Sequence, residues 1–79
     1  MKIYFISQDK HSGYDTYDSA VVIAENEEEA KSIHPNGYDK VEEEGDYTWC
    51  GKEFVKVEYL GEAKEGSTKG VICASFNAG

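Results

Sequence analysis

The chain has 79 residues, enough for one small domain spanning residues 1–79 and too few for a second hydrophobic core. Hydrophobic residues make up 39% and aromatic residues 13%, which excludes a disordered tail although 30% of the residues are charged. Sixteen acidic residues against eight lysines and no arginine give a formal net charge of −8, which argues against direct binding to nucleic acid or anionic lipid.

The first quarter of the chain predicts two strands joined by a long connection. Residues 2–6 place apolar side chains on both alternating faces, which is typical of a central strand covered on both sides. Residues 7–19 contain turn-forming residues at almost every step and predict a long loop. Residues 20–25, with the sequence AVVIAE, predict the second strand.

A short helix is predicted directly after the second strand. Asn26 is a suitable N-cap, and Glu29 completes a variant of the capping box. Three consecutive glutamates, residues 27–29, suit the positive end of the helix dipole. We expect Glu27 and Lys31 to pair on the solvent side, and the helix to end after about two turns at the sequence HPNG, residues 34–37.

The second half predicts an exposed loop and two further strands. Residues 38–46 are polar and indicate the loop, with a small extra strand as an option for residues 47–50. Residues 54–60 alternate between apolar and polar, and residues 70–76 form an apolar run able to pair antiparallel with them. The predicted fold class is therefore α+β: a small antiparallel β-sheet of about four strands, in the order ββαββ, with one short helix packed on one face.

Negative charge is confined to one part of the chain. Residues 9–46 contain twelve acidic residues against three lysines, a local charge of −9, whereas residues 47–79 are balanced. These carboxylates are either a solvated, solubilising surface or an imitation of the phosphate backbone of a nucleic acid. Under the second interpretation, acidic and aromatic side chains contact the partner: Asp15, Asp18, Glu27, Glu28, Glu29, Asp39, Glu42, Glu43, Glu44, Asp46, Tyr14, Tyr17 and Trp49.

Little in the sequence indicates catalysis or metal binding. A nucleophilic pair of Cys50 with His34 or His11 is conceivable, but no flanking signature supports it. The two histidines and two cysteines lie more than fifteen residues apart from one another, unlike the closely spaced ligands of a zinc site. We therefore expect no enzymatic activity, no metal and no cofactor.

Sequence features also bear on location and redox state. No apolar run approaches the roughly 18 residues of a membrane span, and the chain turns polar at Ser7, too early for a signal peptide. We therefore expect a cytoplasmic protein. In that compartment Cys50 and Cys73 are expected to be free thiols, with Cys73 in the core.

Several stretches that together cover most of the chain carry a family resemblance: MKIYFISQD, GYDTYDSAVVIAENEEEAKSIHP, TWC, VEYLGEA and GVICASFNAG. They resemble small uncharacterised proteins of bacterial phages and mobile elements. Small acidic proteins of this origin are similar to the anti-CRISPR inhibitors. The resemblance implies a phage-borne inhibitor, acting in the host cytoplasm, whose acidic surface fills the basic nucleic-acid groove of a Cas surveillance complex and blocks target DNA binding.

A second hypothesis needs no acidic surface. The chain would be a small non-catalytic adaptor or dimerising module that binds a protein through tyrosine and tryptophan side chains or through a sheet edge. Binding by acidic mimicry weakens as salt rises, whereas binding through an apolar surface does not. The sequence leaves the oligomeric state open.

Overall fold

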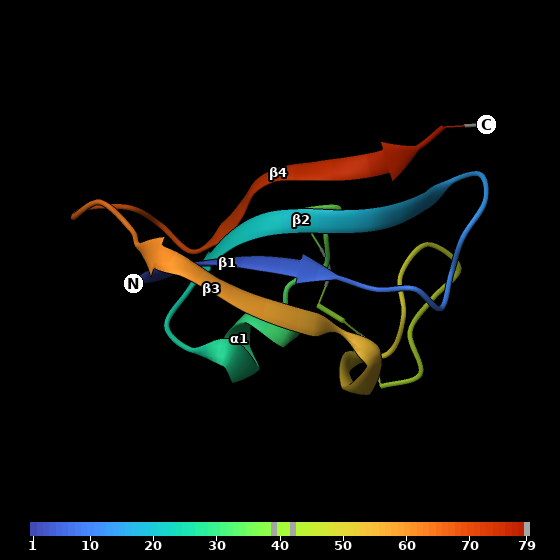
Figure 1. Cartoon of the computed structure of the whole chain (residues 1–79), viewed down its shortest axis with the longest axis horizontal. Helices are drawn as coiled ribbons and strands as arrows, with labels where there is room; N and C mark the ends of the chain where they lie inside the picture. Colours follow the sequence, from blue (N-terminus) through green and yellow to red (C-terminus); the bar gives the residue numbers. More distant parts are fainter. Residues whose placement is uncertain (39, 42, 79) are drawn as a thin grey trace.

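The structure, a computed structural model, describes residues 1–38, 40–41 and 43–78. The elements in chain order are β1 (Lys2–Ser7), β2 (Thr16–Ala24), α1 (Glu27–Lys31), the 3₁₀ turn η1 (Lys52–Phe54), β3 (Lys56–Glu62) and β4 (Gly70–Asn77). The four strands form one antiparallel sheet in the order β3-β1-β2-β4, with the short helix below it (Figure 1). The predicted α+β class, with a small antiparallel sheet and one short helix, is confirmed.

The predicted ββαββ arrangement is not matched. The sequence predicted that the last two strands pair with each other, but β3 lies against β1 and β4 lies against β2, at opposite edges of the sheet (Figure 1). The connection between them passes the N-terminus, where the backbone N–H of Ala63 donates to the carbonyl oxygen of Met1 at 2.9 Å. The two N-terminal strands, β1 and β2, thus lie at the centre of the sheet, where each is hydrogen-bonded to a neighbouring strand on both sides.

The core lies on one face of the sheet, which we call the covered face. In the register of β1 with β2, Tyr4 lies opposite Val22 and Ile6 lies opposite Ala20. The buried cluster combines strand residues with the layer that covers them: Tyr4, Ile6, Ala20, Val22, Ala24, Ala30, Trp49, Cys50 and Val55. Only one member, Ala30, comes from α1, so the chain between α1 and β3 supplies most of the cover.

The start of α1 confirms the predicted cap. The Asn26 side chain accepts a hydrogen bond from the Glu29 backbone at 2.9 Å, and the Glu29 carboxylate accepts one from the Glu25 backbone at 2.7 Å. The predicted pair of Glu27 with Lys31 is wrong, because Lys31 approaches Glu28 at 4.0 Å instead. The helix has only five residues, and the chain turns away well before Pro35.

Two expectations about burial are corrected. Strand β1 is central but covered on one side only, because α1 and the connection that follows it both supply residues to the covered face. Cys73 is exposed on the edge strand β4, whereas Cys50 is buried in the core, and both thiols are free. An edge strand lacks a neighbour on one side, so its side chains keep more solvent contact than those of a central strand.

The loops are shorter and more ordered than predicted. Strand β2 already begins at Thr16, which leaves residues 8–15 as the first connection. There the buried Gln8 side chain donates to the carbonyl oxygens of His11 and Tyr17 and accepts from the backbone of Lys10 and His11. The extra strand considered for residues 47–50 is reduced to an isolated bridge between Gly45 and Cys50.

The turn that carries Trp49 into the core depends on Gly45. This residue has φ of 81°, and a Cβ there would lie 2.5 Å from the backbone nitrogen of Gly51 and 2.7 Å from the carbonyl oxygen of Trp49. We expect Gly45→Ala to lower the free energy of unfolding by about 3 kcal/mol, from conformational strain and steric overlap together.

Gly37→Ala is the matched control for this prediction. Gly37 has a similar φ of 84°, but a Cβ there would meet nothing within 4 Å. Strain alone should cost about 1 kcal/mol. Urea denaturation of both variants tests the idea, and equal losses would contradict the steric role of the Gly45 turn.

Candidate functional site

A histidine–aspartate pair lies beneath the sheet, with the imidazole buried and the carboxylate 40% exposed. His34 is 1% exposed, and its Nε2 lies 2.8 Å from the Asp46 carboxylate. Its Nδ1 accepts a hydrogen bond from the Asn36 backbone at 3.1 Å, so the proton of the neutral ring is on Nε2 and is donated to Asp46. The Tyr17 ring packs edge-on against the imidazole. Because both ring nitrogens are engaged, this geometry favours a structural role over general base catalysis.

Asp46 also organises the turn that leads to Trp49. Its Oδ1 accepts hydrogen bonds from the Thr48 backbone at 2.7 Å, the Thr48 hydroxyl at 2.8 Å and the Trp49 backbone at 3.0 Å. Burial raises the pKa of Asp46, but the hydrogen bonds from Thr48 and His34 outweigh it, so the pKa lies below its usual 3.8. The carboxylate thus fixes both the imidazole and the backbone that positions the tryptophan.

Neither cysteine is placed for nucleophilic chemistry. Burial raises the pKa of Cys50, which keeps this core thiol protonated. Cys73 is exposed on β4, and it makes no hydrogen bond or ion pair with another described residue. Within the described parts of the chain, no three histidine, cysteine or acidic side chains converge as metal ligands would.

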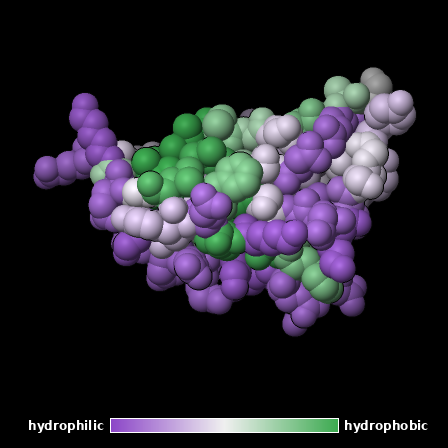
Figure 2. Space-filling view, viewed as in Figure 1, coloured by the Kyte–Doolittle hydropathy of each residue, from purple (hydrophilic) through white to green (hydrophobic). Residues whose placement is uncertain are grey.

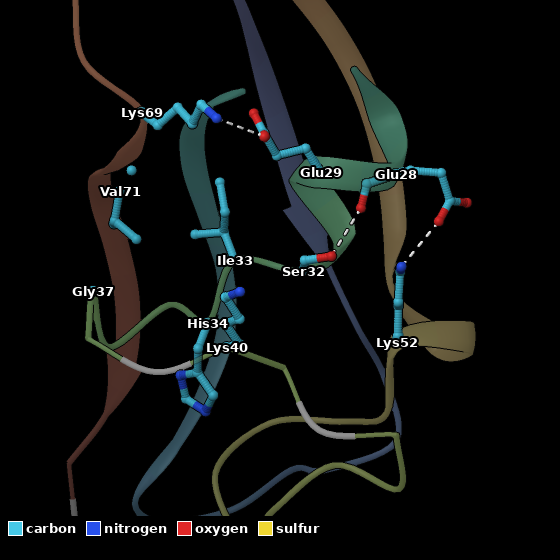
Figure 3. A pocket seen from close by; sticks show the side chains of 11 residues that line it. Glu28, Glu29, Ser32, Ile33, His34, Gly37, Lys40, Lys52, Lys69 and Val71 are labelled. Atoms are coloured by element: carbon cyan, nitrogen blue, oxygen red, sulfur yellow. Dashed lines mark hydrogen bonds and ion pairs between the residues drawn. The ribbon is translucent and has the colours of Figure 1, made fainter. Parts of the chain in front are cut away.

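The structure brings some of the predicted acidic residues together, but with lysines between them. Glu28 and Glu43 line one groove of about 380 Å³ with Lys31, Lys52 and Glu53. The Lys52 ammonium lies 2.9 Å from Glu28, and its hydrogen bond lowers the pKa of that carboxyl (Figure 3). A phosphate-like row of free carboxylates is therefore interrupted at the helix.

A second groove, of about 550 Å³, shows the same mixture of charges. It runs between α1 and β4, with Lys69 at one end and the helix glutamates along one wall (Figure 3). Lys69 lies 2.9 Å from Glu29. The pKa of Glu29 is lowered first by its hydrogen bond from the Glu25 backbone and then by Lys69. Lys40 and Lys52 also line this groove, so its wall is not uniformly acidic.

Other predicted acidic residues lie elsewhere. Asp18 accepts a hydrogen bond from the Asn77 side chain at 2.9 Å, and the Asp15 backbone donates to Asn77, so both aspartates lie at the end of β2 opposite to α1. Glu27, Glu43 and Glu44 are exposed, and no ion pair with another described residue involves them. Asp39 and Glu42 lie outside the described residues.

The aromatic candidates divide between core and surface. Trp49 is 0% exposed, which corrects its assignment to the partner-binding surface: the largest apolar side chain of the chain fills the core. Its indole nitrogen has no hydrogen-bond partner among the described residues. Tyr17 is half-buried between His34 and Phe76, whereas Tyr14 is 73% exposed and available for contact.

Apolar side chains also lie on the second face of the sheet, which we call the open face. Two cross-strand pairs form its centre, Ile3 with Ile23 and Phe5 with Val21, and Cys73 continues the second row on β4. None of these side chains belongs to the core cluster or packs against it. Figure 2 shows hydrophobic residues gathered over the strands, with hydrophilic residues along the side of α1 and the loops.

Both edge strands bulge beside these rows and extend the open face. Leu60 is the extra residue of β3 beside Ile3 and Tyr4, and Ile72 is the extra residue of β4 beside Val21 and Val22. They are 50% and 53% exposed. Neither side chain packs against the core cluster, so we count both with the open face, which comprises Ile3, Phe5, Val21, Ile23, Leu60, Ile72 and Cys73.

Charges around the open face are balanced. Glu58 lies opposite Phe5 and Lys56 opposite Ser7, in the register of β1 with β3. Asp9 binds Lys56 at 3.0 Å, and Lys10 lies 4.8 Å from the centre of the Phe54 ring, in η1 just before β3. Two charges of each sign thus meet at this end of the sheet, in contrast to the acidic helix and loops.

The sequence analysis missed the open face, although a signal for it was present. Residues 2–6, 20–25 and 70–76 place apolar side chains at both odd and even positions, which requires cover on two sides. A chain with a single short helix has cover for one side only. A comparison of the two apolar faces of the predicted sheet with the single predicted helix would have indicated that one face is uncovered.

Comparisons of the chain with family models, with curated proteins and with solved structures gave no match. The resemblance to phage-borne proteins therefore stays a prediction. Among the described residues, no helix has the length and apolar character needed to cross a bilayer.

The hydrogen bonds of Asp46 predict a pH-dependent contribution to stability. Because its folded pKa lies below 3.8, the contribution is complete above that pH and is lost as the pH falls through the lower folded value. Asp46→Asn places an amide N–H against the N–H of His34, so we expect a loss of about 1 kcal/mol at pH 7.

Unfolding free energies of wild type and Asp46→Asn between about pH 2 and pH 7 check this, and their difference should shrink below the ordinary aspartate pKa. Asp9→Asn is the control, since it removes only an exposed pair with Lys56. A constant difference between wild type and Asp46→Asn across this range would refute the assigned role.

Proposed function

We propose that the protein is a non-catalytic interaction module that binds an apolar, uncharged surface of another protein chain through the open face of its sheet. The observation that carries this proposal is the exposed apolar surface that Leu60 and Ile72 extend across all four strands. Apolar surfaces of this kind mark interaction sites, because a sheet gains stability when each apolar face is buried. The balanced charge around the face favours a partner without strong charge of its own.

The open face is better supported as a binding surface than either sheet edge. Strand β3 carries Lys56, Glu58 and Glu62 along its length, and charged side chains discourage strand addition. Strand β4 lacks charges, but its pairing with β2 is shifted at two places. Such bulges twist an edge away from a flat partner strand. Binding through a face rather than an edge follows from these features.

The absence of catalysis in this proposal rests on the titratable groups described above. His34 uses both ring nitrogens within the protein. The core thiol of Cys50 has a raised pKa. In the walls of the two grooves, the helix carboxylates of Glu28 and Glu29 are already paired with Lys52 and Lys69. These features support binding rather than bond-making chemistry.

The test compares what three immobilised forms retain from a bacterial host lysate. Leu60→Lys with Ile72→Lys places two charges on the open face. Tyr47→Lys is the control, since Tyr47 is also an exposed large side chain but lies in a loop. A protein retained by wild type and control, lost by the double variant and held from about 0.05 to 0.5 M salt supports the proposal. Retention by all three forms contradicts it.

A second candidate function is favoured by the exposed carboxylates of Glu27, Glu43 and Glu44, which no described lysine neutralises. We propose, as this alternative, an anti-CRISPR-type inhibitor that places them in the basic nucleic-acid groove of a Cas surveillance complex. The local charge of −9 in residues 9–46 supports attraction to such a groove. The acidic helix side lies away from the open face, so both surfaces can act in one molecule.

Competition with target DNA for a purified Cas surveillance complex tests this alternative. Replacing Glu27, Glu43 and Glu44 together by glutamine should weaken inhibition at least about tenfold and flatten its salt dependence. The control replaces Glu62 and Glu65, which belong to the balanced C-terminal part, by glutamine. Equal inhibition by both variants, or no competition at low salt, excludes nucleic-acid mimicry.

A further inference from the structure

We propose that the partner of the open face is a second copy of this chain, and that two sheets pack face to face as a symmetric dimer with both acidic sides outward. This inference rests on the proposed function, since it names the occupant of the same surface. Three features of the described residues support it: the charge around the face, its self-complementarity and its area.

Charge decides which surface two copies can share. Each copy carries a formal charge of −8, and the excess lies in residues 9–46. Contact through α1 and its neighbouring loop would bring Glu27, Glu43 and Glu44 of the two copies together, at a repulsive cost. The open face has balanced charges at its end and none among its seven apolar members. It is therefore the large surface on which two copies approach without accumulating like charge.

Symmetry adds a second requirement that the open face meets. In a two-fold dimer each patch contacts the same patch of the other copy, so the patch must be complementary to itself. The open face is apolar at its centre, with Leu60 on one edge strand and Ile72 on the other at the level of the Tyr4–Val22 pair. A two-fold axis through the centre sets the apolar side chains of β1 and β2 against one another, and Glu58, the register partner of Phe5 on β3, lies at the edge of this contact.

The area of the face sets the expected strength of the dimer. Four strands about 4.8 Å apart, over roughly six residues of about 3.3 Å each, give on the order of 400 Å² in projection per copy. Two copies together therefore bury roughly 800 Å² in projection, somewhat more with side-chain relief, which is the size of a weak interface below the about 1,200 Å² of stable ones. An interface of this size, without buried polar contacts, is consistent with a dissociation constant of roughly micromolar order.

The dimer would also complete the layering of the fold. Two sheets pack about 10 Å apart with interdigitating side chains, at an angle of about 30°. The open face of a second copy offers the same pleated surface of branched and aromatic side chains. The result is a four-layer arrangement in which both central layers are sheets and both outer layers are the helix and its loops.

Sedimentation equilibrium from about 5 µM to about 1 mM tests the inference. The mean mass of the wild type should rise from one chain toward two, and it should do so at low and at moderate salt alike. Ile72→Lys and Leu60→Lys should each raise the dissociation constant at least about tenfold. The control Tyr47→Lys, in a loop outside the open face, should leave it unchanged.

Alkylation of Cys73 gives a second readout, because this exposed thiol lies on the open face and Cys50 is buried. Its reaction with iodoacetamide in the wild type should slow several-fold between the dilute and the concentrated end of the range, and should not slow in Ile72→Lys. If Ile72→Lys loses its folded circular dichroism, Ile72→Thr replaces it, since threonine keeps the β-propensity of the position.

Two results overturn the inference. A wild type that stays monomeric up to about 1 mM excludes a dimer of this size. If Ile72→Lys and Leu60→Lys both dimerise as strongly as the wild type, the dimer forms through another surface. Neither result removes the proposed function, which fails only if the lysate partner is retained by the open-face double variant.

Discussion

A sheet has two faces, and the described residues of this chain cover one of them. The five-residue helix contributes Ala30 to the core, and the connection before β3 contributes Trp49, Cys50 and Val55. All of them lie against the same side of β1 and β2. A small domain gains its stability from the apolar area that it removes from water. Burial of the uncovered side would therefore stabilise the fold further. This uncovered apolar area is the physical basis of the proposal that the open face binds another chain.

The covered face is built from irregular chain, and polar side chains replace the hydrogen bonds that a helix would supply. Asp46 holds His34 and the backbone of Thr48 and Trp49, while Gln8 holds the end of the first connection. These groups are buried or half-buried and mutually satisfied, which is the condition under which polar groups stabilise a core. The same hydrogen bonds occupy both ring nitrogens of His34, so neither nitrogen is available to transfer a proton to or from a substrate.

Local sequence signals predicted the local structure well. The Asn26 cap and the apolar run of residues 70–76 each rest on interactions within a few residues, and the structure confirms them. The alternating residues 54–60 form a strand in part: β3 begins at Lys56, after the 3₁₀ turn that contains Phe54, and a bulge at Leu60 interrupts the alternation. Strand neighbours were not predictable in this way. Pairing of β3 with β1 rather than β4 depends on long-range competition for the central positions, and the turn-rich sequence of residues 61–69 suits a hairpin and a longer crossing equally.

The candidate site shows the same division. Charge counting located the acidic segment, but it could not show that Lys52 and Lys69, from distant parts of the chain, reach back to Glu28 and Glu29. Trp49 among acidic and aromatic neighbours resembled a binding residue in sequence, while in three dimensions it is the centre of the core. Exposure of Leu60 and Ile72 follows from bulges, which no pattern of residue types specified.

The irregular chain that covers the core affects how this protein unfolds. Cooperative units made of loops open at lower free energy than paired strands, so hydrogen exchange should reach the backbone near Asp46 and Trp49 before that of β1 and β2. In such a partly opened form the strands keep their pairing, but the sheet is bare on both sides. Such a form, with two exposed apolar faces, is prone to aggregate. Its population depends on the stability of the turn between Gly45 and Gly51 more than on the pairing of the strands.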